Sequence, residues 1–242
     1  MKRCAIILAA GRGSRMGGLT DNKPKGLLSF DGSSTVERQL TNLKKVGIKN
    51  ISIVTGYLAD QFSAFEVHTI HNPVWMNTNM LFSLAQSFEW ANKYDQILVS
   101  YADIFFSIDG LTDLMNNNQD ISILYDVNWL SLWKNRFDNP LTDAESFKMD
   151  ENRNLLDIGQ KSNVIETIDG QYMGIIAFRK LGWQTFFNFI FKLPKKELMK
   201  LDMTTALNLF LNKKEMHISC IPFCGKWGEI DSARDLKLYS QP

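Results

Sequence analysis

A short apolar strand followed by a cationic glycine loop constrains the fold of this chain more than any other feature. The segment from Ile6 to Leu28 reads IILAAGRGSRMGGLTDNKPKGLL. Its first residues predict a strand buried on both faces. Glycines let a ligand approach backbone amides closely, and such amides bind phosphate oxygens together with Arg or Lys. The segment therefore predicts a bound polyphosphate at the carboxyl end of the first strand. The loop contains Gly11, Gly13, Gly17 and Gly18 together with Arg12, Arg15, Lys23 and Lys25.

Two common phosphate-binding patterns do not fit this loop. The P-loop pattern GxxxxGK[ST] is absent, because no Gly in the loop is followed by Lys and then Ser or Thr. The dinucleotide pattern GxGxxG begins with Gly11 and Gly13 but has Met16 at the place of its third Gly. The second predicted strand ends in Gly56-Tyr57, without the acidic residue that would bind a ribose. These mismatches argue against a P-loop protein and against a nicotinamide-dependent oxidoreductase.

Composition and the course of the N-terminus limit the class of protein. The formal net charge of the 242 residues is +1, which gives no reason to expect a nucleic acid or a membrane as partner. No apolar run approaches the roughly 18 residues of a membrane span. The chain enters its first predicted strand directly, which leaves no room for a signal peptide. Its three cysteines, Cys4, Cys220 and Cys224, form neither a disulfide framework nor a zinc pattern. We expect a cytoplasmic protein with a single domain spanning residues 1–242.

Strand and helix patterns alternate along the first hundred residues. A capping box at 34–37 opens a helix that Gly47 closes, and an asparagine-rich turn at 77–79 opens another that runs to about Asn92. This alternation predicts a parallel sheet with right-handed crossovers and ligands at the carboxyl ends of its strands. A hairpin pattern around 146–158 adds antiparallel structure, so we expect a mixed sheet whose second half carries the acceptor site. The predicted strands are 6–8, 51–54, 66–70, 96–100, 175–178 and 217–222.

Two segments place carboxylates where a metal ion could bind. Asp103 follows the predicted strand 96–100, and a carboxylate at that edge suits the Mg²⁺ that accompanies a nucleotide triphosphate. In the segment 226–231, Glu229 and Asp231 would lie on one face of a strand without an adjacent cation. The pair Asp231-Ser232 could instead cap the final helix, and an Asp at a strand end often has no function. Both alternatives stay open at this point.

Several motifs resemble the nucleotidyltransferase family. Residues 8–16 match its pattern LAAGxGxRM, and Pro24-Lys25 matches the PK pair that follows it. The segments 101–103, 170–175 and 227–231 continue the resemblance in the family's order over nearly the whole chain. The resemblance implies an α/β fold of nucleotidyltransferase type, with a Rossmann-like, mixed but mainly parallel sheet flanked by helices. It also implies a nucleotide-binding N-terminal half and an acceptor-binding C-terminal half.

The same resemblance implies a site. Arg15 and Lys25 would contact the phosphates, and Asp103 and Asp231 would hold a catalytic Mg²⁺. Gln160-Lys161 departs from the Glu-Lys pair of the family, because Gln replaces the acid and the following Pro is missing. The other implied nucleotide contacts are Leu8, Ala9, Ala10, Gly11, Arg12, Gly13, Ser14, Gly56, Tyr57, Asn77, Asn79 and Ser83. The implied acceptor contacts are Asp126, Trp129, Lys161, Gln171, Tyr172, Gly174 and Glu229.

Within the family, the short length, the segment NTNMLFSL at 77–84 and the segment EIDS at 229–232 are most similar to those of cytidylyltransferases that act on phosphocholine. Related branches act on phosphonates such as aminoethylphosphonate or on phosphorylated amino acids such as glutamine phosphate. The resemblance implies transfer of CMP from CTP to a small phosphorylated or phosphonate acceptor, with release of pyrophosphate, for surface polysaccharide modification. A sugar-1-phosphate nucleotidylyltransferase using UTP or dTTP is the alternative within the family. A catalytically silent nucleotide-sensing subunit is the alternative outside enzymes. The oligomeric state stays open, with a homodimer as one alternative.

An aromatic stretch after residue 124 bears on the acceptor. Trp129 and Trp133 would share a face if the stretch is helical, and Asp126 lies close to them in the sequence. Aromatic faces beside a carboxylate suit a cationic group. The alternative is that these aromatic residues pack in the core or in a lid. On the first interpretation, the acceptor is a small phosphorylated amine or amino acid, or an aminophosphonate.

Overall fold

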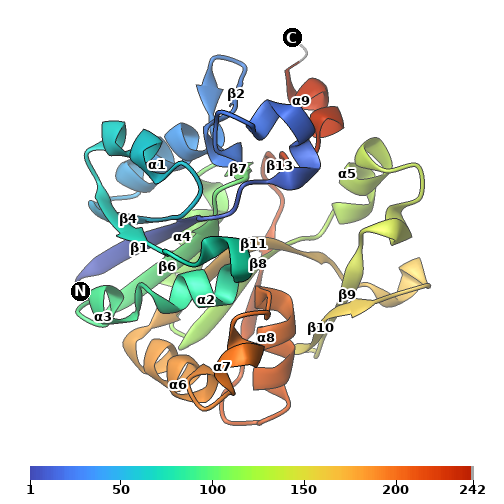
Figure 1. Cartoon of the computed structure of the whole chain (residues 1–242). Coiled ribbons are helices and arrows are strands. Elements are labelled where there is room, and N and C mark those ends of the chain that lie inside the picture. Colours follow the sequence, from blue (N-terminus) through green and yellow to red (C-terminus); the bar gives the residue numbers. More distant parts are fainter. Residues whose placement is uncertain (241–242) are drawn as a thin grey trace.

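The computed structural model describes residues 1–240, and a seven-stranded sheet forms its centre (Figure 1). The order of strands across the sheet is β12-β8-β11-β6-β1-β4-β5. The bounds are β1 (Arg3–Ala9), β4 (Asn50–Thr55), β5 (His68–His71), β6 (Gln96–Tyr101), β8 (Ile121–Asp126), β11 (Gln171–Arg179) and β12 (Ser219–Phe223).

One reversed strand separates two parallel blocks of this sheet. β1 pairs in parallel with β4 and β6, β4 pairs in parallel with β5, and β12 pairs in parallel with β8. β11 runs antiparallel to both of its neighbours, β6 and β8. The prediction of a mixed, mainly parallel sheet is confirmed.

Helices cover both faces of the sheet, which explains why its central strands are continuous apolar runs. All six residues of β8 and all but one residue of β1 are buried. The capping box that opens α1 is present, because Ser34 N donates to Glu37 at 2.7 Å and Glu37 N donates to the Ser34 hydroxyl at 3.3 Å. The helices are α1 (Thr35–Lys45), α2 (Met80–Ala85), α3 (Phe88–Ala91), α4 (Asp109–Asn116), α5 (Trp129–Arg136), α6 (Lys180–Ile190), α7 (Lys195–Leu198), α8 (Met203–Leu211) and α9 (Ala233–Tyr239).

Three small antiparallel pairs lie outside the large sheet. The predicted hairpin is confirmed as β9 (Glu145–Met149) and β10 (Leu155–Lys161). β7 (Ile104–Phe106) pairs with β13 (Trp227–Glu229), and β2 (Ser29–Phe30) pairs with β3 (Ser33–Ser34). The β7–β13 pair matters most for the site, because it brings the C-terminal segment to the end of β6.

Two elements differ from the sequence prediction. The helix expected to run to about Asn92 is divided into α2 and α3, and the Ser87 hydroxyl at the division donates to Leu84 O at 2.6 Å. A serine hydroxyl bonded to a nearby carbonyl competes with regular helix geometry. The third strand begins at His68 rather than Glu66, because Glu66 has a positive φ of 50° that a strand cannot contain.

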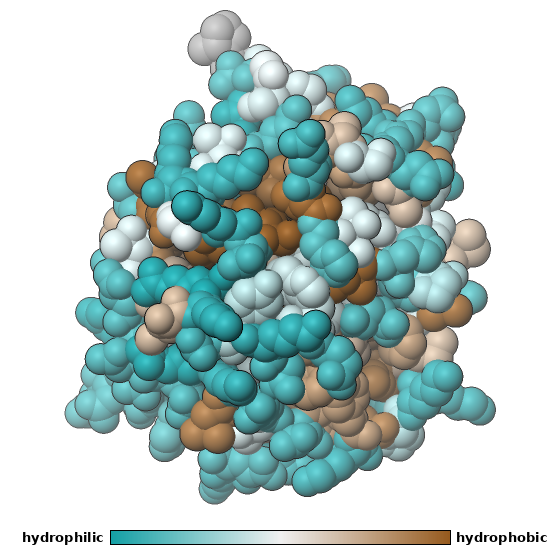
Figure 2. All heavy atoms as spheres, turned by 90° about the vertical axis from the view of Figure 1, so that its left-hand side faces the viewer, coloured by the Kyte–Doolittle hydropathy of each residue, from teal (hydrophilic) through white to brown (hydrophobic). Residues whose placement is uncertain are grey.

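The face of the protein in Figure 2 is mostly hydrophilic. Hydrophilic side chains cover most of this face, and a hollowed hydrophobic region lies in the upper half of Figure 2. Among residues 1–240, no helix is both long enough and apolar enough to cross a membrane.

Candidate active site

The site lies where the carboxyl ends of two central strands meet. Leu8 in β1 is opposite Tyr101 in β6, and Ala102 N donates to Leu8 O at 3.1 Å. The glycine loop after β1 and the residue Asp103 after β6 therefore leave the sheet side by side. A further backbone bond from Ile230 N to Asp103 O, at 2.9 Å, places the segment after β13 against the same edge.

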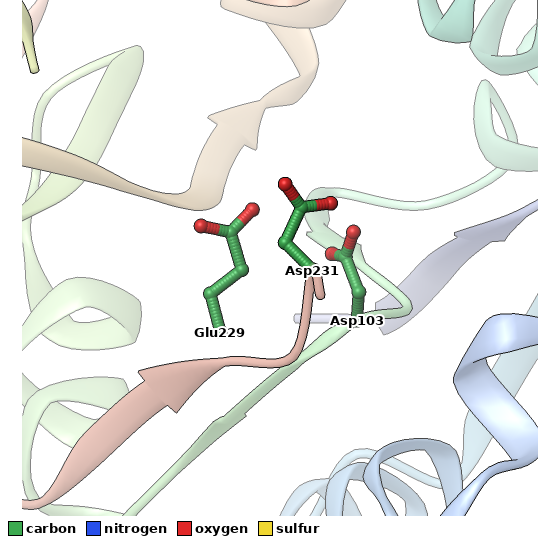
Figure 3. Close-up of side chains that lie close together, drawn as sticks. All are labelled: Asp103, Glu229 and Asp231. Carbon is green, nitrogen blue, oxygen red and sulfur yellow. The ribbon is translucent and has the colours of Figure 1, made fainter. Parts of the chain in front are cut away.

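Three carboxylates meet at this edge. Oxygen atoms of Asp103, Glu229 and Asp231 lie within 4.8 Å of one another. Figure 3 shows the three side chains projecting to the same side of the two segments that carry them. The predicted metal pair, Asp103 and Asp231, is thus brought together. Glu229, which the resemblance placed against the acceptor, joins the same cluster and also lines the adjoining cavity.

The two predicted phosphate-binding cations contact this cluster. Lys25 Nζ lies 2.7 Å from Asp231 Oδ1 and also pairs with Asp103, while Arg15 pairs with Asp231. Gly13 makes room for Lys25, because a Cβ at Gly13 would lie 2.7 Å from the Lys25 side chain and φ there is +74°. All four residues predicted to be catalytic therefore lie together.

Burial and the nearby carboxylates shift the pKa of Lys25 in opposite directions. Burial alone would lower its pKa, but the carboxylates of Asp103, Asp231 and Glu229 raise the pKa above its usual value. The ammonium group therefore stays protonated between the two aspartates. Burial raises the pKa of Glu229, and the nearby Asp103 adds to this effect.

A buried arginine balances Glu229. Arg136 Nη1 lies 3.0 Å from Glu229 Oε2, and Arg136 Nε donates to Asp235 Oδ1 at 2.9 Å. The Arg136 side chain is 1% exposed and that of Asp235 is 4% exposed, so their contact is shielded from water, whereas the Glu229 side chain is partly exposed. Arg136 was not predicted from the sequence, because no motif links this position in α5 with a carboxylate in α9. The expectation that Glu229 and Asp231 lack a cation holds only along the sequence, because distant residues pair both.

The cluster fits a hard divalent cation. Asp103 Oδ1 is buried without a hydrogen-bond partner among the described residues, which leaves its lone pairs free. Carboxylate oxygens are the ligands that Mg²⁺ prefers. The alternative that the pair Asp231-Ser232 caps the final helix is confirmed for Ser232 and not for Asp231. Ser232 is the cap of α9 and forms a capping box with Asp235.

The glycine loop lines a second, smaller cavity beside the cluster. This cavity has a volume of about 190 Å³. Tyr57 is hydrogen-bonded to the glycine loop at two points. Its N–H donates to Ala10 O at 2.9 Å, and its hydroxyl donates to Thr20 O at 2.8 Å. Arg12 pairs with Asp21 at 2.5 Å, so its side chain also contacts the loop itself. The predicted residues that line this cavity are Leu8, Ala9, Gly11, Gly13, Arg15, Lys25 and Asp103.

Four other predicted nucleotide contacts have different surroundings. Gly56 allows a close approach, because a Cβ there would lie 2.5 Å from Trp75 and 2.6 Å from Ala10 O. Asn77 is exposed on the turn before α2. Asn79 caps α2 by accepting from Met80 N at 2.8 Å, and the buried Ser83 hydroxyl accepts from Asn72 at 3.0 Å. Asn79 and Ser83 therefore have hydrogen-bond partners within the protein, and their contact with a nucleotide stays a prediction.

A larger cavity of about 250 Å³ adjoins the carboxylate cluster. Of the predicted acceptor contacts, Gln171, Tyr172, Gly174 and Glu229 line it. Gln171 is nevertheless occupied, because its side chain accepts from Glu145 N at 3.1 Å and donates to Glu145 O at 2.6 Å. Its amide thus positions Glu145 and does not face a ligand freely.

Three predicted acceptor contacts, Asp126, Trp129 and Lys161, do not line this cavity. Asp126 is buried and accepts from Trp227 Nε1 at 2.8 Å, which fixes β8 against β13. Trp129 is buried and packs edge-on against Trp133, with ring centroids 6.0 Å apart. Lys161 is exposed at the end of β10. The cavity instead contains Trp133, the other ring of the predicted aromatic pair, together with Asp143, Glu145 and Asp202, which were not predicted from the sequence.

Comparisons with known proteins agree with this geometry. A curated CTP:phosphoglutamine cytidylyltransferase from Campylobacter jejuni is 31% identical over 97% of this chain and 98% of its own length. A 2-aminoethylphosphonate cytidylyltransferase from Lancefieldella rimae is 38% identical over 88 residues, which are 34% of this chain and 36% of that protein.

The fold is shared with the solved structure of a CTP:phosphocholine cytidylyltransferase from Streptococcus pneumoniae. The TM-score is 0.76 at 22% identity, over 99% of this chain and 98% of that chain. The family model of the MobA-like NTP transferase domain matches residues 5–131, which contain the glycine loop, Lys25 and Asp103. The chain therefore belongs to the MobA-like NTP transferase family.

Proposed function

We propose that this protein is a cytidylyltransferase, which transfers CMP from CTP to a small phosphorylated or phosphonate acceptor. The observation that carries the proposal is the cluster of Asp103, Glu229 and Asp231 beside the glycine loop. This cluster occurs in a chain that matches a CTP:phosphoglutamine cytidylyltransferase over almost its full length. The CMP-linked product is activated for a second transfer, and the resemblance to the cytidylyltransferase branch favours a surface polysaccharide as its destination.

The reaction needs few chemical groups from the protein. An oxygen of the acceptor phosphate attacks the α-phosphorus of CTP in line, a new P–O bond forms, and the bond to the β-phosphate oxygen breaks to release pyrophosphate. The second pKa of a phosphate monoester is about 6, so the nucleophile is already anionic near neutral pH and needs no general base. The protein must bring two anions together and neutralise the charge that develops.

Different residues of the cluster would neutralise the charge on different phosphates of CTP. Arg15 and Lys25 neutralise the β- and γ-phosphates and thereby favour departure of pyrophosphate. Asp103 and Asp231, with Glu229 beside them, would hold Mg²⁺. A bound Mg²⁺ stabilises negative charge on the α-phosphate. Arg136 keeps Glu229 in place through a buried ion pair.

Pyrophosphate release from a matrix of nucleotides and acceptors tests this function. The nucleotides are CTP, UTP and dTTP, and the acceptors are phosphocholine, aminoethylphosphonate, glutamine phosphate and glucose 1-phosphate. We expect turnover with CTP and a nitrogen-containing acceptor, dependent on Mg²⁺ or Mn²⁺. Preference for glucose 1-phosphate with UTP or dTTP would show a sugar nucleotidylyltransferase. Nucleotide binding without pyrophosphate release in any combination would show a silent sensing subunit.

A further inference from the structure

A second group of carboxylates lines the acceptor cavity, away from the metal-type cluster. Asp143 lies just before β9, Glu145 is the first residue of β9, and Asp202 caps α8. Gln171 in β11 holds the backbone of Glu145 at both its N–H and its carbonyl. The position of Glu145 at the cavity wall is therefore fixed by the sheet and not by a flexible loop.

No lysine or arginine within the described residues forms a direct ion pair with this group, although burial raises the pKa of Asp143 and the nearby Arg136 and Arg15 act against that rise. Among residues 1–240, none of the ion pairs within 4.0 Å involves Asp143, Glu145 or Asp202. Asp143 accepts from Trp133 Nε1 at 3.0 Å, and Asp202 accepts from Thr205 N at 2.7 Å. Burial raises the pKa of Glu145, and the nearby Asp202 and Asp143 raise it further, against a hydrogen bond from Thr204. Glu145 therefore lies near other carboxylates with a hydroxyl donor but with no ion-pair partner among the described residues.

The aromatic rings of the same region are already in contact with protein groups. The guanidinium of Arg136 lies 5.4 Å from the centroid of the Trp133 ring. Trp129 packs edge-on against Trp133 at 6.0 Å, and Tyr101 packs edge-on against Tyr172 at 5.9 Å. A quaternary ammonium group binds through aromatic faces, because it has no N–H to donate. This cavity offers hydrogen-bond acceptors more freely than it offers aromatic faces.

We propose that the acceptor carries a primary ammonium group, which lies between Glu145 and Asp202 and donates hydrogen bonds to the Glu145 carboxylate. This inference rests on the proposed function and names the acceptor class. The three N–H donors of a primary ammonium match the carboxylates of the cavity. The same cavity extends to Arg15 and Asp231, so the phosphate of a short acceptor can lie at the carboxylate cluster while its ammonium group contacts Glu145.

Phosphoethanolamine and phosphocholine form the matched pair that tests the inference, because they differ only in three N-methyl groups. With CTP and Mg²⁺, we expect kcat/KM to be about tenfold or more higher for phosphoethanolamine, as charged hydrogen bonds are lost on methylation. Glu145→Gln should raise KM for phosphoethanolamine much more than it lowers kcat. It should also bring the kcat/KM values for phosphoethanolamine and phosphocholine closer together. The control is Glu151→Gln, which removes an exposed carboxylate from the β9–β10 turn.

The outcomes separate the inference from the proposed function. Equal use of the two acceptors, or a preference for phosphocholine, overturns the primary-ammonium inference while the cytidylyltransferase function stands. An unchanged preference in a folded Glu145→Gln variant overturns the role of Glu145. Absence of pyrophosphate release with every acceptor, in a protein that binds CTP, overturns the proposed function itself.

Discussion

Two groups of carboxylates lie along one cleft and differ in what neutralises them. Asp103, Glu229 and Asp231 contact Lys25, Arg15 and Arg136, which come from three distant segments. Asp143, Glu145 and Asp202 have no such ion pairs within the described residues, and accept hydrogen bonds from Trp133, Thr204 and Thr205 instead. The described residues thus supply direct ion-pair partners to the first group and none to the second.

This difference in ion pairing suits the two groups of carboxylates to the different ligands proposed for them. Like charges held close together destabilise a fold unless cations or hydrogen bonds offset them. At the first group, internal cations offset the charge and would have to move for a metal ion and phosphates to bind as proposed. At the second group, a cationic ligand would itself supply the missing charge.

The largest effect should come from the first group. Asp103→Ala and Asp231→Ala should each lower kcat/KM by roughly a thousandfold, because a metal ion supplies several kcal/mol of transition-state stabilisation. Steady-state pyrophosphate release measures the loss. Asp113→Ala, which removes an exposed acid from α4, serves as the control. Near-normal turnover in either site variant would remove that residue from the metal site.

The next largest effect concerns the buried cation. Arg136→Met should destabilise the protein by about 3–5 kcal/mol, because Glu229 and Asp235 lose their buried partner. In a protein of this size that corresponds to a fall in Tm of roughly 6–20 °C. Arg234→Met is the matched control, since it breaks an exposed pair with Asp138 that contributes about 0–1 kcal/mol. Equal Tm values for the two variants would contradict the role of Arg136.

The contrast also explains what could be predicted from the sequence. The first group follows from local motifs, since the glycine loop, the Pro24-Lys25 pair and the Asp after β6 all leave the same edge of a parallel sheet. Arg136 could not be predicted, because its partners lie in α9 and β13 and no periodicity connects them. The second group was missed for a similar reason. Glu145 faces the cavity because Gln171 in β11 clamps its backbone, and that pairing is set by tertiary structure.

The aromatic residues illustrate a related limit. The spacing of Trp129 and Trp133 correctly placed them near each other in a helix. Spacing alone does not show which of the two buried rings lines the cavity, because that depends on what packs against α5. Asp126 was assigned to the acceptor because it lies close to these rings in the sequence, but its carboxylate accepts a hydrogen bond from Trp227. The mixed character of the sheet was predictable from the antiparallel patterns that follow the parallel units, although the hairpin itself forms a separate two-stranded sheet.

A third prediction concerns the lysine that bridges Asp103 and Asp231. Without nucleotide, its ammonium group occupies the space between the carboxylates, so a divalent metal must displace it. Lys25→Met should therefore bind Mn²⁺ more tightly than the natural protein when no nucleotide is present. The same variant should bind CTP about 10- to 150-fold more weakly, because it loses a charged hydrogen bond to phosphate.

Titration with Mn²⁺ by electron paramagnetic resonance, and with CTP by calorimetry, measures both constants. Lys23→Met removes an exposed charge from the same loop and is the matched control. Unchanged Mn²⁺ affinity in Lys25→Met would mean that the lysine does not compete with the metal ion.

The smallest effect should come from the second group in the absence of ligand, where its unpaired charge lowers stability. Burial raises the pKa of Glu145 above the usual value of 4.5, so the folded protein keeps this proton more firmly than the unfolded chain does. Between 4.5 and the raised pKa, the unfolded chain binds fewer protons, and the free energy of unfolding therefore falls as pH rises.

Glu145→Gln removes this contribution and should unfold at a higher temperature than the natural protein at pH 8, but not at pH 4.5. We expect calorimetry to show a gain in Tm at pH 8 that is smaller than the change expected for Arg136→Met. Glu151→Gln, at an exposed position, should show no such pH-dependent gain. A lower Tm for Glu145→Gln at pH 8 would mean that Glu145 is already compensated in the free protein, and the contrast between the two groups would then disappear.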